Sequence, residues 1–187
     1  IRKEGKGKEF DVAVGVSGGC DSSYMLHLSK ELGLRPLAVH FDNTWNSTTA
    51  VENIQNVLSG LDVDLYTYVV DNEEYDDIYR AFMLAGTPDT ESPTDLGLAV
   101  TLNLACEKYG IRYIFEGHSF RTEGICPIGW LYMDARYIAS VHKQFGNLPM
   151  KTFPNMWMSS FLKWTVTQPL TKIRPLYWID YNKQQAM

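Results

Sequence analysis

The residues of this sequence that are best suited to chemistry form the short segment 17–23, Ser-Gly-Gly-Cys-Asp-Ser-Ser. An apolar, valine-rich run over residues 10–16 precedes it and predicts a buried strand, and a helical apolar periodicity begins at Tyr24. Glycines let the backbone approach an anion, consecutive N–H groups can surround it, and a helix N-terminus adds its dipole. The segment therefore predicts a phosphate-binding loop.

Two common phosphate-binding patterns are excluded for this loop. It contains no lysine, so it is not GxxxxGK[ST], and it lacks the spacing of GxGxxG. A simpler interpretation stays open, in which two glycines form a turn and Asp21 or Ser22 caps the next helix. The strand before the loop and the helix after it favour the binding interpretation, because a motif needs that context.

Composition narrows the functional classes. The 187 residues are 45% hydrophobic and 21% charged, which is typical of one globular domain. A net charge of −5 argues against a nucleic-acid partner, although a local basic patch remains compatible with it. We find no apolar run of about 20 residues for a membrane span and no signal peptide, so a cytoplasmic protein is expected. Three cysteines without CxxC spacing predict neither a disulfide framework nor a zinc site, and they are Cys20, Cys106 and Cys126.

The order of apolar patterns predicts an α/β fold. Four strands are expected, at residues 10–16, 36–41, 65–70 and 111–115. Helical periodicity lies between them, with Asn46 or Ser47 as the cap of the second helix and Thr94 or Asp95 as the cap of a buried helix over 96–109. Strands that alternate with helices predict a doubly wound, mostly parallel sheet with flanking helices.

The ends of the chain and residues beyond 119 follow a different pattern. Residues 1–9 are mostly Lys, Glu and Gly and are expected to be a solvated lead-in to a single domain over 10–187. The chain starts without methionine and stops where a helix begins, so we expect a fragment of a longer chain. Helices are predicted up to Gly146 and over 156–166, and strand-like sequence returns at 173–176. No repeat or low-complexity segment is present.

Polar residues follow each predicted strand, which places a candidate site at one edge of the sheet. They lie in the segments 17–22, 40–42, 71 and 116–118. Open parallel sheets bind ligands at the carboxyl ends of their strands. Plainer roles stay open for several of these residues: His40 as a core histidine, Asp42 as the start of a turn and Asp71 as a helix cap.

The loop resembles the SGGxDS signature of the PP-loop ATP pyrophosphatases, with Ser17, Gly18, Gly19, Asp21 and Ser22 in place. The resemblance implies that ATP is the cofactor and that the loop holds the β- and γ-phosphates, so pyrophosphate is the leaving group. It implies that Asp21 helps to hold Mg²⁺ or positions the loop, and that Asp21 and Ser22 take part in catalysis. The nucleotide-binding residues it implies are Ser17, Gly18, Gly19, Asp21, Ser22, Ser23, His40, Phe41, Asp42, Gly117 and His118.

Four further segments resemble the N-acetyl sugar amidotransferases, a branch of these enzymes in bacterial surface-polysaccharide synthesis. They are residues 37–46, 93–95, 116–124 and 151–154. The resemblance implies that the amide oxygen of a nucleotide-linked N-acetyl sugar attacks the α-phosphorus of ATP. Ammonia then displaces AMP and leaves an acetamidino group. Residues 119–170 are the candidate acceptor region, with Arg121 and Glu123 as catalytic candidates, because aromatic side chains there suit a sugar ring and Arg or Lys suits its phosphates. A role of these aromatic residues in the core or in a subunit interface stays open.

The sequence also suggests where ammonia comes from and which other functions are possible for this chain. No Cys-His pair is evident for glutamine hydrolysis, so a separate glutaminase subunit is expected, and a homo-oligomer is left open. One alternative is a tRNA-modifying PP-loop enzyme, a thiolase or lysidine-type synthetase, for which Cys126 is a lone sulfur-carrying candidate. A ligase that amidates acids and a nucleotide-binding module without chemistry are the others.

Overall fold

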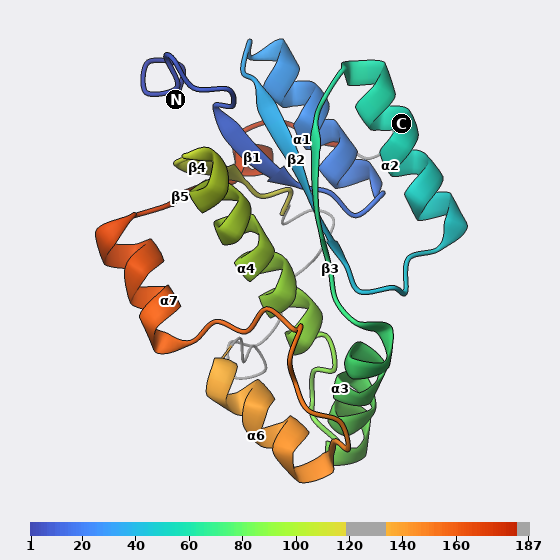
Figure 1. The fold of residues 1–187 in the computed structure, drawn as a ribbon. Helices are drawn as coiled ribbons and strands as arrows, with labels where there is room; N and C mark the ends of the chain where they lie inside the picture. Colours follow the sequence, from blue (N-terminus) through green and yellow to red (C-terminus); the bar gives the residue numbers. More distant parts are fainter. Residues whose placement is uncertain (119–133, 183–187) are drawn as a thin grey trace.

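The computed structural model describes residues 1–118 and 134–182, which form a sheet with helices on both faces (Figure 1). All strand pairings are parallel, in the order β3-β2-β1-β4-β5. The strands are β1 (Val12–Gly15), β2 (Pro36–Asp42), β3 (Leu65–Val69), β4 (Tyr113–Phe115) and β5 (Thr171–Ile173). The predicted α/β fold with a doubly wound parallel sheet is therefore confirmed.

Seven helices flank this sheet in the described residues, besides a short helical turn. They are α1 (Cys20–Glu31), α2 (Thr48–Leu61), α3 (Asn72–Ala85), α4 (Ser92–Tyr109), α6 (Ala135–Phe145), α7 (Met158–Leu162) and the π-helix η2 (Lys163–Thr167), with the 3-10 turn η3 (Pro175–Tyr177). Within residues 1–118 and 134–182, none of them has both the length and the apolarity to cross a membrane.

Alternation along β1 divides the core between the two faces of the sheet. Val12 and Val14 pack with α1 and α2, whereas Ala13 faces α4, and all three side chains are fully buried. Burying a valine contributes roughly 1.5–3 kcal/mol, so this short central strand stabilises both layers. Figure 1 shows α4 on one side of β1 and β2 and the α1–α2 pair on the other.

The strand order creates a reversal beside β1. The chain runs from β1 through β2 to β3 on one side, and α3 and α4 then carry it back to β4 on the other side of β1. The connections that leave β1 and β4 therefore diverge from neighbouring strand ends. In open α/β sheets this reversal is where ligands bind, because diverging connections leave a crevice there.

Several predicted helix ends are correct. The Ser47 hydroxyl accepts from the Ala50 N–H at the start of α2, and Asp71 caps α3 through the Glu74 N–H. The prediction that Thr94 or Asp95 caps α4 is wrong. The helix begins at Ser92, with Pro93 in its first turn, and the Thr94 hydroxyl instead lies 2.6 Å from the Tyr75 hydroxyl.

The prediction of a strand-like segment over 173–176 is also wrong in its extent. Strand β5 ends at Ile173 and pairs with β4, so it is a fifth strand where four had been expected. After it, residues 175–177 form a 3-10 turn. Proline has no N–H to donate to a ladder, which explains why the strand does not extend through Pro175.

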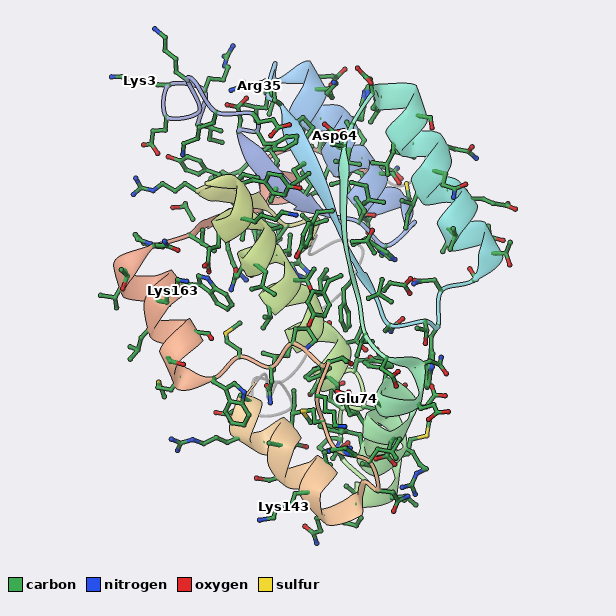
Figure 2. The ribbon with its side chains drawn as sticks, viewed as in Figure 1. Lys3, Arg35, Asp64, Glu74, Lys143 and Lys163 are labelled. Atoms are coloured by element: carbon green, nitrogen blue, oxygen red, sulfur yellow. The ribbon has the colours of Figure 1, made fainter. Side chains whose placement is uncertain are left out.

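Two buried carboxylates on α3 hold the segment 147–153 against that helix. Glu74, labelled in Figure 2, accepts from the backbone N–H groups of residues 151, 152 and 153 at 2.8–3.0 Å. Asp77 accepts from the N–H groups of Asn147 and Leu148 and lies 3.0 Å from His142 Nε2. Burial raises the pKa of Asp77, but these bonds and Arg80 outweigh burial and hold it well below its usual range.

Replacing Glu74 with Gln is expected to lower the free energy of unfolding. Both Glu74 oxygens accept hydrogen bonds from backbone N–H groups, and the amide nitrogen of Gln cannot accept one. The loss of a hydrogen bond to a charged group costs about 1.5–3 kcal/mol. Urea denaturation measures the change. The matched control is Glu73→Gln on the exposed side of the same turn, with an expected change within about 0.5 kcal/mol. Equal stability of the two variants would contradict the role of Glu74.

Candidate nucleotide site

The backbone of the loop between β1 and α1 is shaped by Gly18. Its φ of +77° lies in the left-handed region, and a Cβ there would lie 2.4 Å from the carbonyl oxygen of Ala50 in α2. Only glycine meets both conditions without strain. Gly19 is the N-cap of α1 and provides no side-chain capping bond. The first-turn N–H groups of a helix have no i−4 partners, so this end of α1 is suited to an anion.

Side chains fix the loop by bonding its carbonyl oxygens. The Ser23 hydroxyl donates to the Gly19 carbonyl at 2.9 Å, and the Asn53 amide donates to the Gly18 carbonyl at 3.2 Å. The Ser22 hydroxyl also donates to the Gly19 carbonyl, at 3.1 Å, and lies 3.4 Å from the Ser17 N–H. In a trans peptide the next N–H is directed opposite to the carbonyl. The N–H groups of Gly19 and Cys20 are therefore directed away from these bonds.

The end of β2 has a well-packed structure beside this loop. His40 is buried, with Nδ1 2.8 Å from the Val16 carbonyl and Nε2 3.2 Å from the Asn46 amide nitrogen. The carbonyl can only accept, so Nδ1 carries the proton and Nε2 accepts from Asn46. Asp42 accepts from Asn46 and from the Thr44 N–H, which forms a local turn. These contacts match the plainer roles that the sequence left open.

Phe41 lies on the opposite side of β2 from His40. Its ring is buried in the core against α4, where a Cβ on Gly97 would lie 2.6 Å from it. The structure thus gives Phe41 a packing role. Contact of residues 40–42 with an adenine ring stays a prediction, which their position after β2 and beside the loop allows.

At the end of β4, Glu116 is tied to β5 and the residue that follows it. Its carboxylate lies 2.8 Å from Lys172 Nζ and 2.9 Å from Arg174 Nε. Burial raises the pKa of Glu116, but these two cations outweigh burial and leave the pKa below its ordinary value. The ion pairs hold the edge strand onto the sheet.

Gly117 brings the end of β4 against the loop. A Cβ on Gly117 would lie 3.5 Å from Met25 and 3.6 Å from the Asp21 carbonyl. His118 is exposed at the next position. The structure therefore brings the predicted segments 17–23 and 117–118 together at the switch point between β1 and β4.

Sequence reasoning missed Tyr181, which contacts the loop from the far end of the chain. Its side chain is buried, and its hydroxyl donates to Asp21 Oδ1 and lies 3.7 Å from Cys20 Sγ. Burial and the neighbouring Asp21 raise the pKa of Tyr181 far above its ordinary value, so it remains a hydrogen-bond donor. The contact spans 160 residues, and no local pattern signals it.

The predicted acceptor region is described only in part. Arg121 and Glu123 lie outside the described residues, as does Cys126. Phe153 and Trp164 are buried in the core, and the Trp164 indole donates to Glu107 at 3.1 Å. These two aromatic side chains thus pack within the protein, and the catalytic roles of Arg121 and Glu123 stay predictions.

Comparison with known proteins identifies relatives among tRNA-modifying enzymes. No protein-family model matches the chain. A tRNA-specific 2-thiouridylase (MnmA) of Colwellia psychrerythraea is 30% identical over 130 residues, which is 62% of this chain and 35% of that protein. The MnmA of Proteus mirabilis is 30% identical over 129 residues, 61% of this chain and 35% of that protein. The chain spans about a third of the length of these curated relatives.

Two solved structures illustrate the similarity of fold. One is described as a predicted subunit of tRNA methyltransferase from Methanocaldococcus jannaschii, with a TM-score of 0.50, 14% identity and coverage of 95% of this chain and 72% of that one. Another is the glutamine-dependent NAD⁺ synthetase of Acinetobacter baumannii with ADP, with a TM-score of 0.50, 17% identity and coverage of 82% and 32%. At such low identity these likenesses concern the fold alone.

The curated relatives and the SGGxDS segment support the PP-loop ATP pyrophosphatase superfamily for this chain. They overturn the sugar amidotransferase interpretation, because the curated relatives are tRNA-specific 2-thiouridylases. The structure gives a physical reason for the error. In two of the segments that suggested that branch, residues serve packing: Thr94 bonds Tyr75, and residues 151–153 bind Glu74. These packing contacts account for Thr94 and residues 151–153 without an acceptor sugar.

Substituting Gly18 with Ala is expected to destabilise the protein, whereas Gly19→Ala is tolerated. A left-handed alanine costs about 1–2 kcal/mol, and overpacking against Ala50 adds about 1–3 kcal/mol. At Gly19 the backbone has φ −85° and the nearest atom to a Cβ is 3.5 Å away, so a change within about 1 kcal/mol is expected. Thermal or urea unfolding separates the two variants. Similar stability for both would show that Gly18 is not constrained as described.

Glu116→Gln is expected to lower stability most at neutral pH. The folded pKa of Glu116 lies below its ordinary value of 4.5, so its contribution is present above that pH and is lost as pH falls through the folded value. A loss of about 1–3 kcal/mol at pH 7 is expected, because two charged partners lose their acceptor. Urea unfolding from pH 7 to pH 3 should show the gap to wild type closing below pH 4.5. A gap that widened with acid would contradict this assignment.

Proposed function

We propose that this chain is the ATP-dependent activating part of a tRNA-modifying PP-loop enzyme of the thiolase kind. The observation that carries the proposal is its 30% identity over 130 residues to a tRNA-specific 2-thiouridylase. The phosphate-binding geometry of residues 17–23 at the end of β1 supports it. Superfamily members are enzymes, and a cytoplasmic location fits a tRNA substrate.

The chemistry requires activation of a carbonyl oxygen. In forming 2-thiouridine, the C2 oxygen of uridine attacks the α-phosphorus of ATP, the bond to the bridging oxygen breaks and pyrophosphate leaves. Hydrosulfide, or the terminal sulfur of a persulfide, then adds at C2. In the persulfide case a second thiol attacks the carrier sulfur, so that the S–S bond to the transferred sulfur breaks and a disulfide forms on the carrier. The original oxygen departs with AMP, which is a far better leaving group than an oxide. The enzyme's main contribution is electrostatic, at the phosphates that gain charge.

The residues of the site have defined roles in this proposal. The N–H groups of Gly19 and Cys20 and the N-terminus of α1 would bind the departing pyrophosphate. Asp21 would hold Mg²⁺, an ion that typically binds one or two carboxylates together with substrate phosphates. Its carboxylate in the first turn of α1 fits that requirement. When bound, Mg²⁺ would neutralise charge on the phosphates.

The cysteines differ in their fitness to supply sulfur. Cys106 is buried, and burial raises the pKa of its thiol to about 12. It stays protonated at neutral pH, and a thiol is a poor nucleophile. We therefore assign the sulfur-carrying role to Cys126, to partly exposed Cys20 or to an external donor, and not to Cys106.

The acidic composition bears on how tRNA would bind. The expectation of no nucleic-acid partner stays untested, and the proposed function departs from it. With a net charge of −5 this chain attracts phosphates weakly. We propose that other parts of a longer protein supply most of the contact with the tRNA backbone. This division fits a chain that spans about a third of its curated relatives.

The proposal predicts that tRNA stimulates the release of AMP and pyrophosphate from ATP. The protein that contains this chain is incubated with Mg²⁺, α-³²P-labelled ATP, unmodified tRNA and sulfide as the sulfur nucleophile, and AMP is quantified by thin-layer chromatography. We expect AMP to increase at least tenfold over the reaction without tRNA, because only the uridine oxygen supplies the attacking nucleophile. Asp21→Asn should reduce this release by about 10–100-fold.

The control is Asp62→Asn, a carboxylate at the far end of α2, which should leave AMP release unchanged. A tRNA transcript in which 2-thiouridine already replaces the target uridine should give no stimulation. AMP formation that is indifferent to tRNA, with ATP still bound, would overturn the tRNA-modifying function and leave a nucleotide-binding module.

A further inference from the structure

The C-terminal segment 174–182 is anchored beside the nucleotide loop at several points. Arg174 bonds Glu116 at the end of β4, and Leu176 is buried in the core between the sheet and α1. Tyr181 is 4% exposed in the same core, and its ring centroid lies 5.1 Å from that of Tyr24. The segment is therefore fixed at both of its ends, and the position of Tyr181 is set by packing as well as by its hydroxyl.

The hydroxyl of Tyr181 is directed at the first turn of α1. It donates to Asp21 Oδ1 and lies 3.7 Å from Cys20 Sγ. A buried tyrosine hydroxyl needs a partner, and here the partner is the carboxylate of Asp21, whose backbone carbonyl lies beside Gly117 at the switch point. Core packing alone would be satisfied by phenylalanine, so the oxygen requires a separate explanation.

We propose that Tyr181 is a positioning residue that orients the Asp21 carboxylate for Mg²⁺ and the phosphates of ATP. The inference rests on the proposed function of the loop. Asp21 is on the surface of a helix end, where a free carboxylate would adopt several rotamers. A hydrogen bond from a buried, immobile donor selects one of them. Outer-sphere partners of this kind typically change metal affinity by about 10–100-fold when removed.

The test is a double-mutant cycle on nucleotide binding, which does not require tRNA. Binding of a fluorescent ATP analogue is measured across a Mg²⁺ titration for wild type, Tyr181→Phe, Asp21→Asn and the double variant. We expect Tyr181→Phe to weaken binding about tenfold and to raise the Mg²⁺ concentration that gives half-maximal binding. In the Asp21→Asn background the same change should have less than a twofold effect, because Tyr181 acts through Asp21.

The matched control is Tyr24→Phe, which removes a hydroxyl from the ring that packs on Tyr181 and should leave Mg²⁺ dependence unchanged. Circular dichroism establishes that each variant is folded. Unchanged binding by Tyr181→Phe, loss of its fold, or equal effects of that substitution with and without Asp21 would overturn the inference. If wild type binds no Mg·ATP, the proposed function and this inference fall together, whereas normal wild-type binding with an unaffected Phe variant overturns the inference alone.

Discussion

Gly18 packs directly against the first turn of α2, and the candidate site depends on that contact. A Cβ at this position would lie 2.8 Å from Ala50 Cα, and the left-handed backbone reverses the chain between β1 and α1. Because the reversal is tight, α1 begins at Cys20, immediately above the carboxyl end of β1. The N-terminus of α1 therefore opens at the switch point between β1 and β4, where a phosphate group can reach it.

The remaining structure holds the surroundings of that turn in place. His40 bonds the Val16 carbonyl at the end of β1, and Glu116 ties β4 to Lys172 and Arg174. Buried Glu74 and Asp77 of α3 keep the segment 147–153 against that helix. His40, Glu74 and Asp77 are buried, and the Glu116 side chain is 10% exposed, whereas its partners Lys172 and Arg174 lie at the surface. The rigidity of the site thus comes from satisfied buried hydrogen bonds as well as from apolar packing.

Local sequence patterns predicted the parts of the fold that local physics controls. Valine-rich β1, the glycine turn and the caps at Ser47 and Asp71 all follow from neighbouring residues, and all are confirmed. Strand β5 has three residues, too few for a clear alternation, so its extent was misplaced. The start of α4 was misplaced because Thr94, a residue typical of caps, bonds Tyr75 instead.

The long-range parts of the site could not be predicted in this way. Tyr181 meets Asp21 across 160 residues, and nothing in the sequence around either residue indicates that contact. The roles of Glu74 and Asp77 could not be predicted either, because the pattern of α3 does not reveal that residues 147–153 cover these carboxylates. The same burial explains why segment 151–154 suggested acceptor chemistry when its backbone binds a carboxylate.

The proposed contact between the loop over 17–23 and the triphosphate of ATP is tested most directly by a crystal structure of the protein with Mg²⁺ and α,β-methylene ATP, whose P–C–P bridge resists cleavage. We expect β- or γ-phosphate oxygens within about 3 Å of the N–H groups of Gly19 and Cys20, with Mg²⁺ on Asp21. A nucleotide bound elsewhere, with no phosphate in contact with this loop, would contradict it.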